Sequence, residues 1–330
     1  MIRICFALSY LFFAGDLFAV ERAEFKNHGR LKVTDGKITS EAGEIVTLQG
    51  GAMMDGLAYN YSKQTVEYLK AKGANLVRIP LSWGRSGLSQ SYEEHWNRFK
   101  EIADWAVEMD LYFIADFHAV ASPKQSQLKE TSIRFFTDVA KTYGSSGLVI
   151  YELLNEAPGK SSYSSYVPWS EIKEYSEEII DVIRSIDPQS LIIVGPPNWS
   201  QQLEFPLDDP VERENLAYSL HFYSTLHLFD ERLNELAESL PIIVTEWAAQ
   251  TPENSTGEID FESLNQYVDW MNEYNISWAA WSFSDELQPY GWFYPGAFAD
   301  RYLDDSELRP WGSMVLDLLD DRNLNKTVGW

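Results

Sequence analysis

Residues 111–156, LYFIADFHAVASPKQSQLKETSIRFFTDVAKTYGSSGLVIYELLNE, contain the repeating unit that decides the fold. Two short apolar runs, at 111–118 and 148–156, flank a longer connecting segment. Short runs rich in β-branched and aromatic residues are typical of buried strands. A connection of this length between two such runs is typical of a strand–helix–strand unit. The stretch therefore predicts two parallel strands that are joined by a helix.

The same unit recurs on both sides, with strand onsets about 25 to 40 residues apart. A hairpin-like stretch at 31–50, LKVTDGKITSEAGEIVTLQG, comes first. Six further runs have strand character: IVTLQG (45–50), NLVRIP (75–80), LIIVGP (191–196), NLAYSLHFY (215–223), PIIVTEW (241–247) and SWAAWSFSD (277–285). Between runs, apolar residues fall at helical spacing, for example Ile172, Tyr175, Ile179, Val182 and Ile186. Eight such units predict an α/β fold, a (β/α)8 TIM barrel with an N-terminal β-hairpin. The alternative is an open doubly wound sheet, but the chain lacks its G-x-G-x-x-G or P-loop signature.

Polar or aromatic residues end most of the apolar runs. They are Arg78, His118, Asn155, Glu156, His221, Tyr223, Glu246 and Trp281. In a barrel the carboxyl ends of the strands meet at one face, where active sites are built. Charges inside apolar strands are costly unless they are paired, so several strands with this pattern predict a site.

Two carboxylates, Glu156 and Glu246, end the fourth and seventh runs. Glycoside hydrolysis needs such a pair, one protonated to serve the leaving oxygen and one ionised. The structural alternative is that each glutamate pairs with Arg78 or a histidine in an ion network. A metal site at Asp116, His118 and His221 lacks the H-E-x-x-H motif, and a serine triad lacks its G-x-S-x-G elbow. We expect neither a metal nor a cofactor.

Aromatic residues make up 14% of the chain, with 12 tryptophans. Aromatic rings stack on the apolar faces of sugar rings. Five tryptophans follow or end strand runs and are candidates for such platforms: Trp83, Trp199, Trp247, Trp281 and Trp292.

The formal net charge is −24, from 50 acidic and 26 basic residues. A surface with this much negative charge repels phosphate backbones and anionic lipids, so nucleic acid and acidic membranes are poor partners, and we expect no nucleic-acid partner. A neutral or cationic substrate fits better. The single cysteine, Cys5, lies near the N-terminus. A chain without that segment has no disulfide, cysteine nucleophile or thiolate metal site.

Residues 1–19 have a basic residue, an apolar run and a small residue at Ala19. This pattern predicts a secretory signal peptide, and thus a secreted or periplasmic protein without a membrane anchor. The alternative is an N-terminal helix of the domain. Residues 20–330 then form a single catalytic barrel domain, with no residues left for a carbohydrate-binding module. We expect a monomer.

Seven motifs resemble glycoside hydrolase family 5, and among its branches the bacterial secreted endo-β-1,4-glucanases. The resemblance runs from about Leu31 to Trp311. The motifs are GANLVRIP (73–80), DFH (116–118), YELLNEAPG (151–159), IIVGPPNWSQ (192–201), NLAYSLHFYS (215–224), LPIIVTEW (240–247) and ISWAAWSFSD (276–285).

The resemblance implies a retaining enzyme with Glu156 as acid/base and Glu246 as nucleophile. It implies that Arg78 and Tyr223 hold Glu246 ionised and that His221 contacts Glu156 or the leaving group. Asn155 would bind the sugar 2-hydroxyl and His118 the sugar in the −1 subsite. Trp281 would be the −1 platform and Trp199 a platform on the leaving-group side. A retaining mechanism places the two carboxyl groups about 5–5.5 Å apart.

Three positions depart from these glucanases. Asp55 stands where they have a sugar-binding histidine, Tyr59 replaces a stacking tryptophan, and Glu286 follows Asp285 where they have a lysine. All three are expected at the non-reducing end of the substrate. We therefore expect hydrolysis of β-1,4-glucan, of cellulose or mixed-linkage type. Mannan, glucomannan or xyloglucan are alternative substrates, and a catalytically silent glycan-binding barrel is the alternative of another class.

Overall fold

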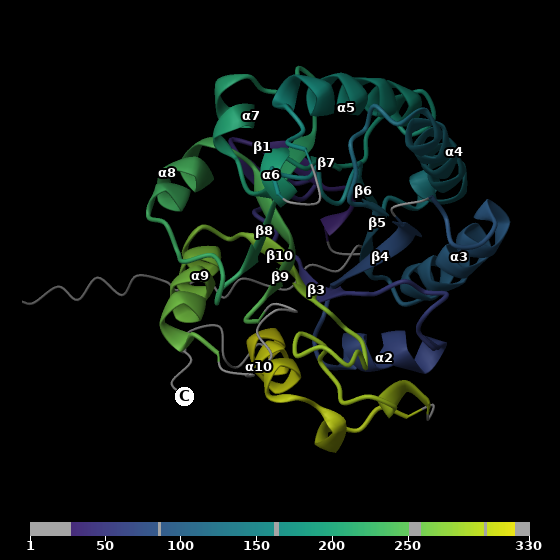
Figure 1. Cartoon of the computed structure of the whole chain (residues 1–330), viewed down its shortest axis with the longest axis vertical. Coiled ribbons are helices and arrows are strands. Elements are labelled where there is room, and N and C mark those ends of the chain that lie inside the picture. The colour runs from purple at the N-terminus through teal and green to yellow at the C-terminus, as the bar shows by residue number, and fades with distance from the viewer. Residues whose placement is uncertain (1–27, 85–86, 162–164, 251–258, 300–301, 321–330) are drawn as a thin grey trace, which may run out of the picture.

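The computed structural model describes residues 28–84, 87–161, 165–250, 259–299 and 302–320. Within these ranges, eight parallel strands close into a barrel (Figure 1). They are β3 (Gln49–Ala52), β4 (Leu76–Trp83), β5 (Tyr112–Ala119), β6 (Val149–Glu152), β7 (Ile192–Val194), β8 (Leu216–Tyr223), β9 (Ile242–Ala248) and β10 (Ser277–Trp281). Each strand pairs with the next in the chain, and β10 closes the ring by pairing with β3. The predicted (β/α)8 barrel is confirmed.

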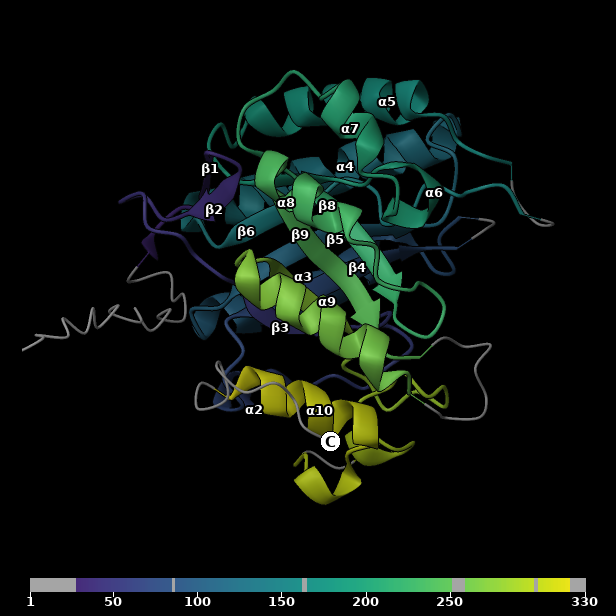
Figure 2. The ribbon, with the colours of Figure 1, turned by 90° about the vertical axis from the view of Figure 1, so that its left-hand side faces the viewer.

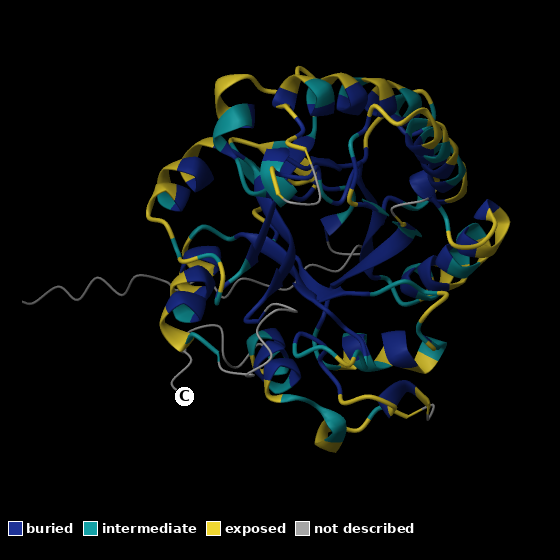
Figure 3. Ribbon diagram, viewed as in Figure 1, coloured by how far each residue is buried: buried dark blue, intermediate teal, exposed yellow. Residues whose placement is uncertain are grey.

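Helices surround the barrel, with their inner faces buried and their outer faces exposed (Figure 3). They are α2 (Lys63–Ala71), α3 (Tyr92–Glu108), α4 (Ser126–Tyr143), α5 (Trp169–Arg184), α6 (Pro197–Ser200), α7 (Glu204–Asp208), α8 (Arg232–Ser239), α9 (Phe261–Glu273) and α10 (Pro310–Leu319). In α5, the buried residues Ile172, Tyr175, Ile179 and Ile183 repeat every three or four positions. This spacing gives the helix one apolar face toward the strands. No helix in the described ranges is long and apolar enough to cross a membrane.

The N-terminal hairpin consists of β1 (Lys32–Thr34) and β2 (Lys37–Thr39), which pair antiparallel. Its two-residue turn, Asp35–Gly36, has positive φ angles of 49° and 72°, as this kind of tight hairpin requires. The Val33 amide donates to Asn215 Oδ1 at 2.8 Å, just before β8 begins. The hairpin therefore lies at the end of the barrel where the strands start, away from the arrowheads of β8 and β9 (Figure 2). The prediction of an N-terminal hairpin is confirmed.

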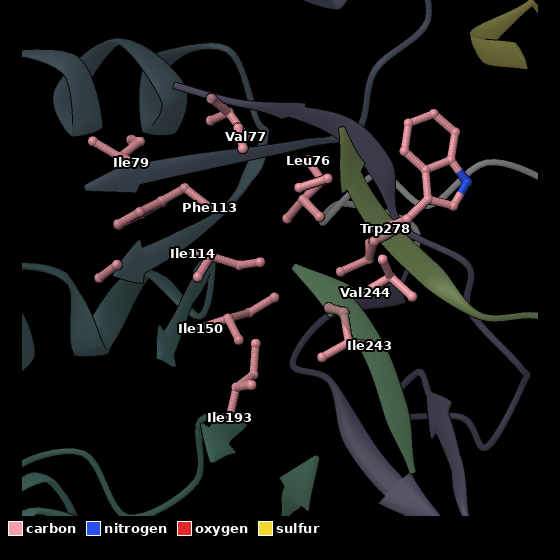
Figure 4. Close-up of a cluster of buried hydrophobic side chains, with 14 of the residues drawn as sticks. Leu76, Val77, Ile79, Phe113, Ile114, Ile150, Ile193, Ile243, Val244 and Trp278 are labelled. Carbon is pink, nitrogen blue, oxygen red and sulfur yellow. The ribbon is translucent and has the colours of Figure 1, made fainter. Parts of the chain in front are cut away.

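The strands contribute a continuous apolar core (Figure 4). Its members come from β4, β5, β6, β7, β9 and β10 and are all 2% exposed or less: Leu76, Val77, Ile79, Phe113, Ile114, Ile150, Ile193, Ile243, Val244 and Trp278. Burial of each such side chain stabilises the fold by about 1.5–3 kcal/mol relative to exposure. The core fixes the strands rigidly, so side chains at their carboxyl ends are held in place.

Several strand boundaries differ from the sequence prediction; β10, for example, ends at Trp281 rather than at Asp285. Two of the differences have a clear physical reason or bear on the site. The first barrel strand begins at Gln49 rather than at Ile45 and includes two glycines. At Gly50 a Cβ atom would lie 1.7 Å from the Leu76 carbonyl oxygen, so only glycine allows β3 and β4 to approach. The fourth strand ends at Glu152, and Glu156 lies four residues beyond it. The predicted signal peptide, residues 1–19, lies outside the described residues.

Candidate active site

Polar side chains from β4, β5, β8 and β9 meet near the ends of these strands, around Glu246. Arg78 Nη1 donates to Glu246 Oε2 at 3.3 Å, and the Tyr223 hydroxyl donates to Glu246 Oε1 at 2.6 Å. Burial raises the pKa of Glu246, but the positive charges of His221, Arg78 and His118 outweigh burial and lower it. Glu246 is therefore ionised at neutral pH.

Arg78 is fully buried and joins several of these groups. Its Nε donates to Glu152 Oε2 at 2.6 Å, and its Nη2 donates to Asn155 Oδ1 at 2.6 Å. Asp116 Oδ2 lies 3.0 Å from the same Nη2. A buried guanidinium is tolerated only when its donors are paired, and this one is surrounded by acceptors. Because Arg78 donates to the side-chain oxygen of Asn155, the side-chain NH₂ group of Asn155 remains a donor.

Glu156 contacts His221, whose Nδ1 lies 3.0 Å from Glu156 Oε1. The other nitrogen of His221, Nε2, is 2.8 Å from Thr245 Oγ1, and that hydroxyl donates to Glu152 Oε1 at 2.6 Å. Burial raises the pKa of Glu156, and the nearby charge of Glu246 raises it further, against the opposing effect of His221. The two glutamates are thus shifted in opposite directions, which is typical of an acid and its partner carboxylate.

One carboxylate oxygen of Glu156 and one of Glu246 lie within 4.8 Å of each other. Retaining glycosidases have carboxyl groups about 5–5.5 Å apart, and inverting ones about 6.5–9.5 Å apart. The separation therefore fits the retaining geometry.

Glu156, His221 and Glu246 are also close enough together to surround a cation. Both ring nitrogens of His221, however, already contact protein oxygens. Burial lowers the pKa of His221, but the carboxylates of Glu152, Glu156 and Glu246 outweigh burial and raise it to about 9. A protonated histidine donates hydrogen bonds and cannot ligate a metal, so the cluster fits a hydrogen-bond network better.

His118 and Trp281 form a stacked pair beside this network. Their ring centroids are 5.6 Å apart and their planes differ by 5°. His118 Nδ1 is 2.7 Å from Asp116 Oδ2. Burial lowers the pKa of His118, but the charge of Asp116 outweighs it and raises the pKa. Trp281 ends β10 and is 7% exposed.

Trp199 lies in the short segment α6, on the side of Glu156. It is partly exposed, and its backbone N–H donates to the carbonyl of Ala157 at 2.9 Å. The ring is thus attached to the loop that carries Glu156. This is the side where the family resemblance implies a leaving-group platform.

The three departing residues lie in the loops after β3 and β10, and their side chains make local contacts. Asp55 accepts from the Leu57 amide at 2.8 Å, and Glu286 accepts from the Leu287 amide at 2.9 Å. The ring of Tyr59 lies 6.2 Å from that of Tyr61. The Tyr61 hydroxyl accepts from the Met54 amide and donates to the Phe283 carbonyl, which ties the two loops together.

Glu152, Thr245 and Asp116 also belong to this network, although their place in the site was not predicted from the sequence. Glu152 is fully buried inside the apolar run 148–156, so the rule that a buried charge needs a partner could have identified it. Conversely, two of the candidate platforms are wrong. Trp247 and Trp292 are fully buried, and Trp247 packs edge-on against Trp278 and Trp311.

Comparison with known proteins agrees with this geometry. Residues 39–287 match the family described as Cellulase (glycosyl hydrolase family 5). An endoglucanase from Clostridium saccharobutylicum is 29% identical over 307 residues, which is 90% of this chain and 66% of the relative. Endoglucanase E-5 from Thermobifida fusca is 29% identical over 297 residues, or 83% of this chain and 60% of the relative. The chain thus spans less than two thirds of the length of these curated relatives.

Among solved structures, the catalytic domain of the Thermobifida fusca endoglucanase Cel5A superposes with a TM-score of 0.81 at 28% identity, covering 89% of this chain and 98% of that one. A variant of the same domain in complex with cellotetraose has a TM-score of 0.80, with the same identity and coverage. The family match covers most of the chain, and the chain forms a barrel with this pair of glutamates. The chain therefore belongs to glycosyl hydrolase family 5.

Proposed function

We propose that this protein is a retaining endo-glycosidase that hydrolyses β-1,4-glucan, of cellulose or mixed-linkage type. The observation that carries the proposal is the close pair Glu156 and Glu246, whose pKa values are shifted in opposite directions. The names of the relatives, which are endoglucanases, support the substrate class, as does the cellotetraose bound to the Thermobifida fusca domain.

In the first step, Glu246 attacks the anomeric carbon and forms a covalent bond to it. The glycosidic C–O bond breaks as Glu156 gives its proton to the leaving oxygen. In the second step, Glu156 removes a proton from a water molecule, which attacks the anomeric carbon and releases Glu246. Every proton and electron pair that moves in these two steps comes from the two carboxyl groups, the substrate or water. The chemistry therefore needs no cofactor.

The surrounding residues support these two steps. Arg78 and Tyr223 hold Glu246 ionised and oriented, because each donates to one of its oxygens. Asn155 offers its NH₂ group to the sugar 2-hydroxyl, a bond that strengthens in the transition state. His118 and Trp281 line the −1 subsite, with the tryptophan as the stacking surface. Trp199 supports the first sugar of the leaving group.

The mechanism is tested by Glu246→Ala. Without the nucleophile, kcat on a soluble β-glucan should fall by roughly 10⁴-fold, while substrate binding persists. With the activated substrate 2,4-dinitrophenyl β-cellobioside, added azide should restore turnover and yield an α-glycosyl azide. NMR of the wild-type products should show the β-anomer first. Initial formation of the α-anomer, or activity retained in the variant, would overturn the assignment.

The identity of the glycan is tested by assays on barley β-glucan, carboxymethylcellulose, glucomannan, xyloglucan and xylan. Activity on the first two supports the proposal, and inactivity on both with activity on glucomannan or xyloglucan would instead favour the alternative substrates. Asp55, Tyr59 and Glu286 are the residues to exchange next, because they lie in the loops after β3 and β10. Binding without turnover on all five would identify a silent glycan-binding barrel.

We also infer that the protein is secreted or periplasmic, on the basis of the signal-peptide pattern at residues 1–19. Expression of the full chain in a bacterium and N-terminal sequencing of the exported protein test this. Cleavage after Ala19 supports the inference, and an intact N-terminus in the cytosolic fraction would contradict it.

A further inference from the structure

The segment α6 contains three consecutive residues in the left-handed conformation. Asn198, Trp199 and Ser200 have φ angles of 58°, 55° and 56°. For residues with a side chain this conformation costs about 1–2 kcal/mol each, and it persists only where the surroundings enforce it. Such strain in a segment beside Glu156 calls for a physical reason.

The reason lies in two hydrogen bonds that this turn makes on either side of Glu156. The Ser200 hydroxyl donates to the carbonyl of Asn155 at 3.0 Å, and the Trp199 N–H donates to the carbonyl of Ala157 at 2.9 Å. From the opposite direction, the amides of Asn155 and Glu156 each donate, at 3.1 Å, to carbonyls of β5. The backbone around Glu156 is therefore fixed by four hydrogen bonds.

Two glycines allow the turn to approach this closely. A Cβ atom at Gly159 would lie 1.9 Å from Asn198 Oδ1 and 2.4 Å from the Trp199 ring. A Cβ atom at Gly195 would lie 2.8 Å from the Ser200 hydroxyl oxygen. The serine itself is fully buried, so water cannot substitute for its hydrogen bond to Asn155 without entering the interior.

We propose that Ser200 is a positioning residue for the acid/base, acting through the Asn155 carbonyl to set where Glu156 meets the leaving oxygen. This inference rests on the proposed function. A general acid must lie within hydrogen-bond reach of the atom it protonates, and a displacement of about 1 Å can cost about 10²-fold in rate. Glu246 and the side chain of Asn155 are held by other bonds: Arg78 and Tyr223 donate to Glu246, and Arg78 also donates to Asn155 Oδ1.

The test uses two substrates that differ in their need for an acid. The glycosidic oxygen of cellotetraose must be protonated as it leaves, whereas the dinitrophenolate of 2,4-dinitrophenyl β-cellobioside leaves without a proton. In Ser200→Ala, kcat/KM should fall about tenfold to a hundredfold on cellotetraose and stay within about twofold on the aryl substrate. The ratio is measured on one preparation, so partial unfolding cancels.

Ser219→Ala is the matched control. Ser219 is also fully buried, on the neighbouring strand β8, and its hydroxyl has no hydrogen-bond partner among the described residues. Both kcat/KM values should therefore remain near those of the wild type. Ser200→Gly should lose the same activity as Ser200→Ala while relieving the left-handed strain, which separates the hydrogen bond from the strain.

Equal losses on both substrates in Ser200→Ala, or no loss on cellotetraose, would overturn the positioning role. Glu156→Gln provides the benchmark, because it should show the same selective loss in stronger form. If Glu156→Gln lost activity equally on both substrates, the acid/base assignment itself would be wrong. The failure of the proposed function is thus distinguishable from the failure of this inference.

Discussion

Arg78 links the carboxylates of the site from inside the barrel. Its guanidinium contacts Glu152, Asp116 and Glu246 as well as the Asn155 amide, with no exposure to solvent. Burial raises the pKa of Glu152, but the charge of Arg78 and the contribution of His221 outweigh it and lower the pKa to about 2. Removal of one member of such a buried group leaves uncompensated charge, at a cost of about 3–5 kcal/mol. The same cation that holds the site together thus also keeps Glu246 ionised.

The opposite shifts at Glu246 and Glu156 predict a bell-shaped pH profile of kcat/KM. Activity requires Glu246 ionised, so it falls as the pH drops through the lowered pKa of Glu246. Activity also requires Glu156 protonated, so it falls as the pH rises through the raised pKa of Glu156. Because the two groups interact, the limbs report the pair rather than single residues. Initial rates on cellotetraose from acid to alkaline pH measure both limbs.

His221→Gln should move both limbs of this profile to higher pH. The imidazolium lowers the pKa of Glu246 and opposes the rise at Glu156, so its removal raises both pKa values. His95→Gln is the control, because His95 is a buried histidine that contacts Ser89 in a different part of the molecule. An unmoved profile in His221→Gln, or a shift toward acid, would contradict the electrostatic role of His221.

Much of the site could be predicted from single residues, because polar side chains at the ends of apolar strands stand out. The structure brings Arg78, Asn155, Tyr223, His221 and the two glutamates into mutual contact. The geometry at Ser200 could not be predicted. Asn198 tolerates the left-handed conformation, but nothing in Trp199 or Ser200 favours its continuation over three residues. The cause lies in tertiary contacts with a loop about forty residues away in the chain.

At the level of the elements, β3 shows how a strand can depend on missing side chains. Its sequence, Gln49–Ala52, includes Gly50 and Gly51, which weaken a strand prediction because glycine has low strand propensity. Because the residues just before it are more apolar, the predicted strand begins too early, at Ile45. The position of the strand is instead set by the close approach of β3 to β4, which local strand propensities do not include.

Gly50→Ala should destabilise the barrel severely. The new Cβ would lie 1.7 Å from the Leu76 carbonyl oxygen, which is backbone and can move only if β4 moves. We expect a loss of several kcal/mol in the free energy of unfolding, measured by urea denaturation. Gly43→Ala is the control for backbone strain. Gly43 has a positive φ of 88° and open space around it, so an alanine there meets strain but no contact, and its cost should be about 1 kcal/mol. Gly50 lacks the positive φ, so a cost at Gly50 no larger than that at Gly43 would contradict the role of the contact with Leu76.

On the scale of the whole molecule, the alternation of strand and helix patterns was sufficient to predict the barrel. It follows from chain-wide periodicity, since each helix must cover the strands with its apolar face. The boundaries of individual strands are harder to predict, because they depend on contacts between strands such as that at Gly50. The arrangement of the residues that the structure leaves undescribed, including the leader at 1–19, stays a prediction.

The net charge of −24 predicts an effect of salt that depends on the charge of the substrate. Carboxymethylcellulose is anionic and is repelled, and salt screens this repulsion over a distance of about 10 Å at 0.1 M. Raising sodium chloride should therefore increase kcat/KM on carboxymethylcellulose. Hydroxyethylcellulose, a neutral soluble derivative of the same backbone, is the control and should respond little. Parallel responses of the two polymers would argue against electrostatic repulsion.

The hairpin at the base of the barrel has a practical consequence. Its turn residue Asp35 is exposed, and the Lys37 ammonium fastens the hairpin to the carbonyls of Ala237 and Tyr274. The residues described ahead of the hairpin are fastened there too, since the Tyr112 hydroxyl donates to the Gly29 carbonyl where β5 begins. A bead or electrode coupled at position 35 would therefore be attached at the end of the barrel where the strands begin. The catalytic end would face the bulk liquid, open to long polymer chains.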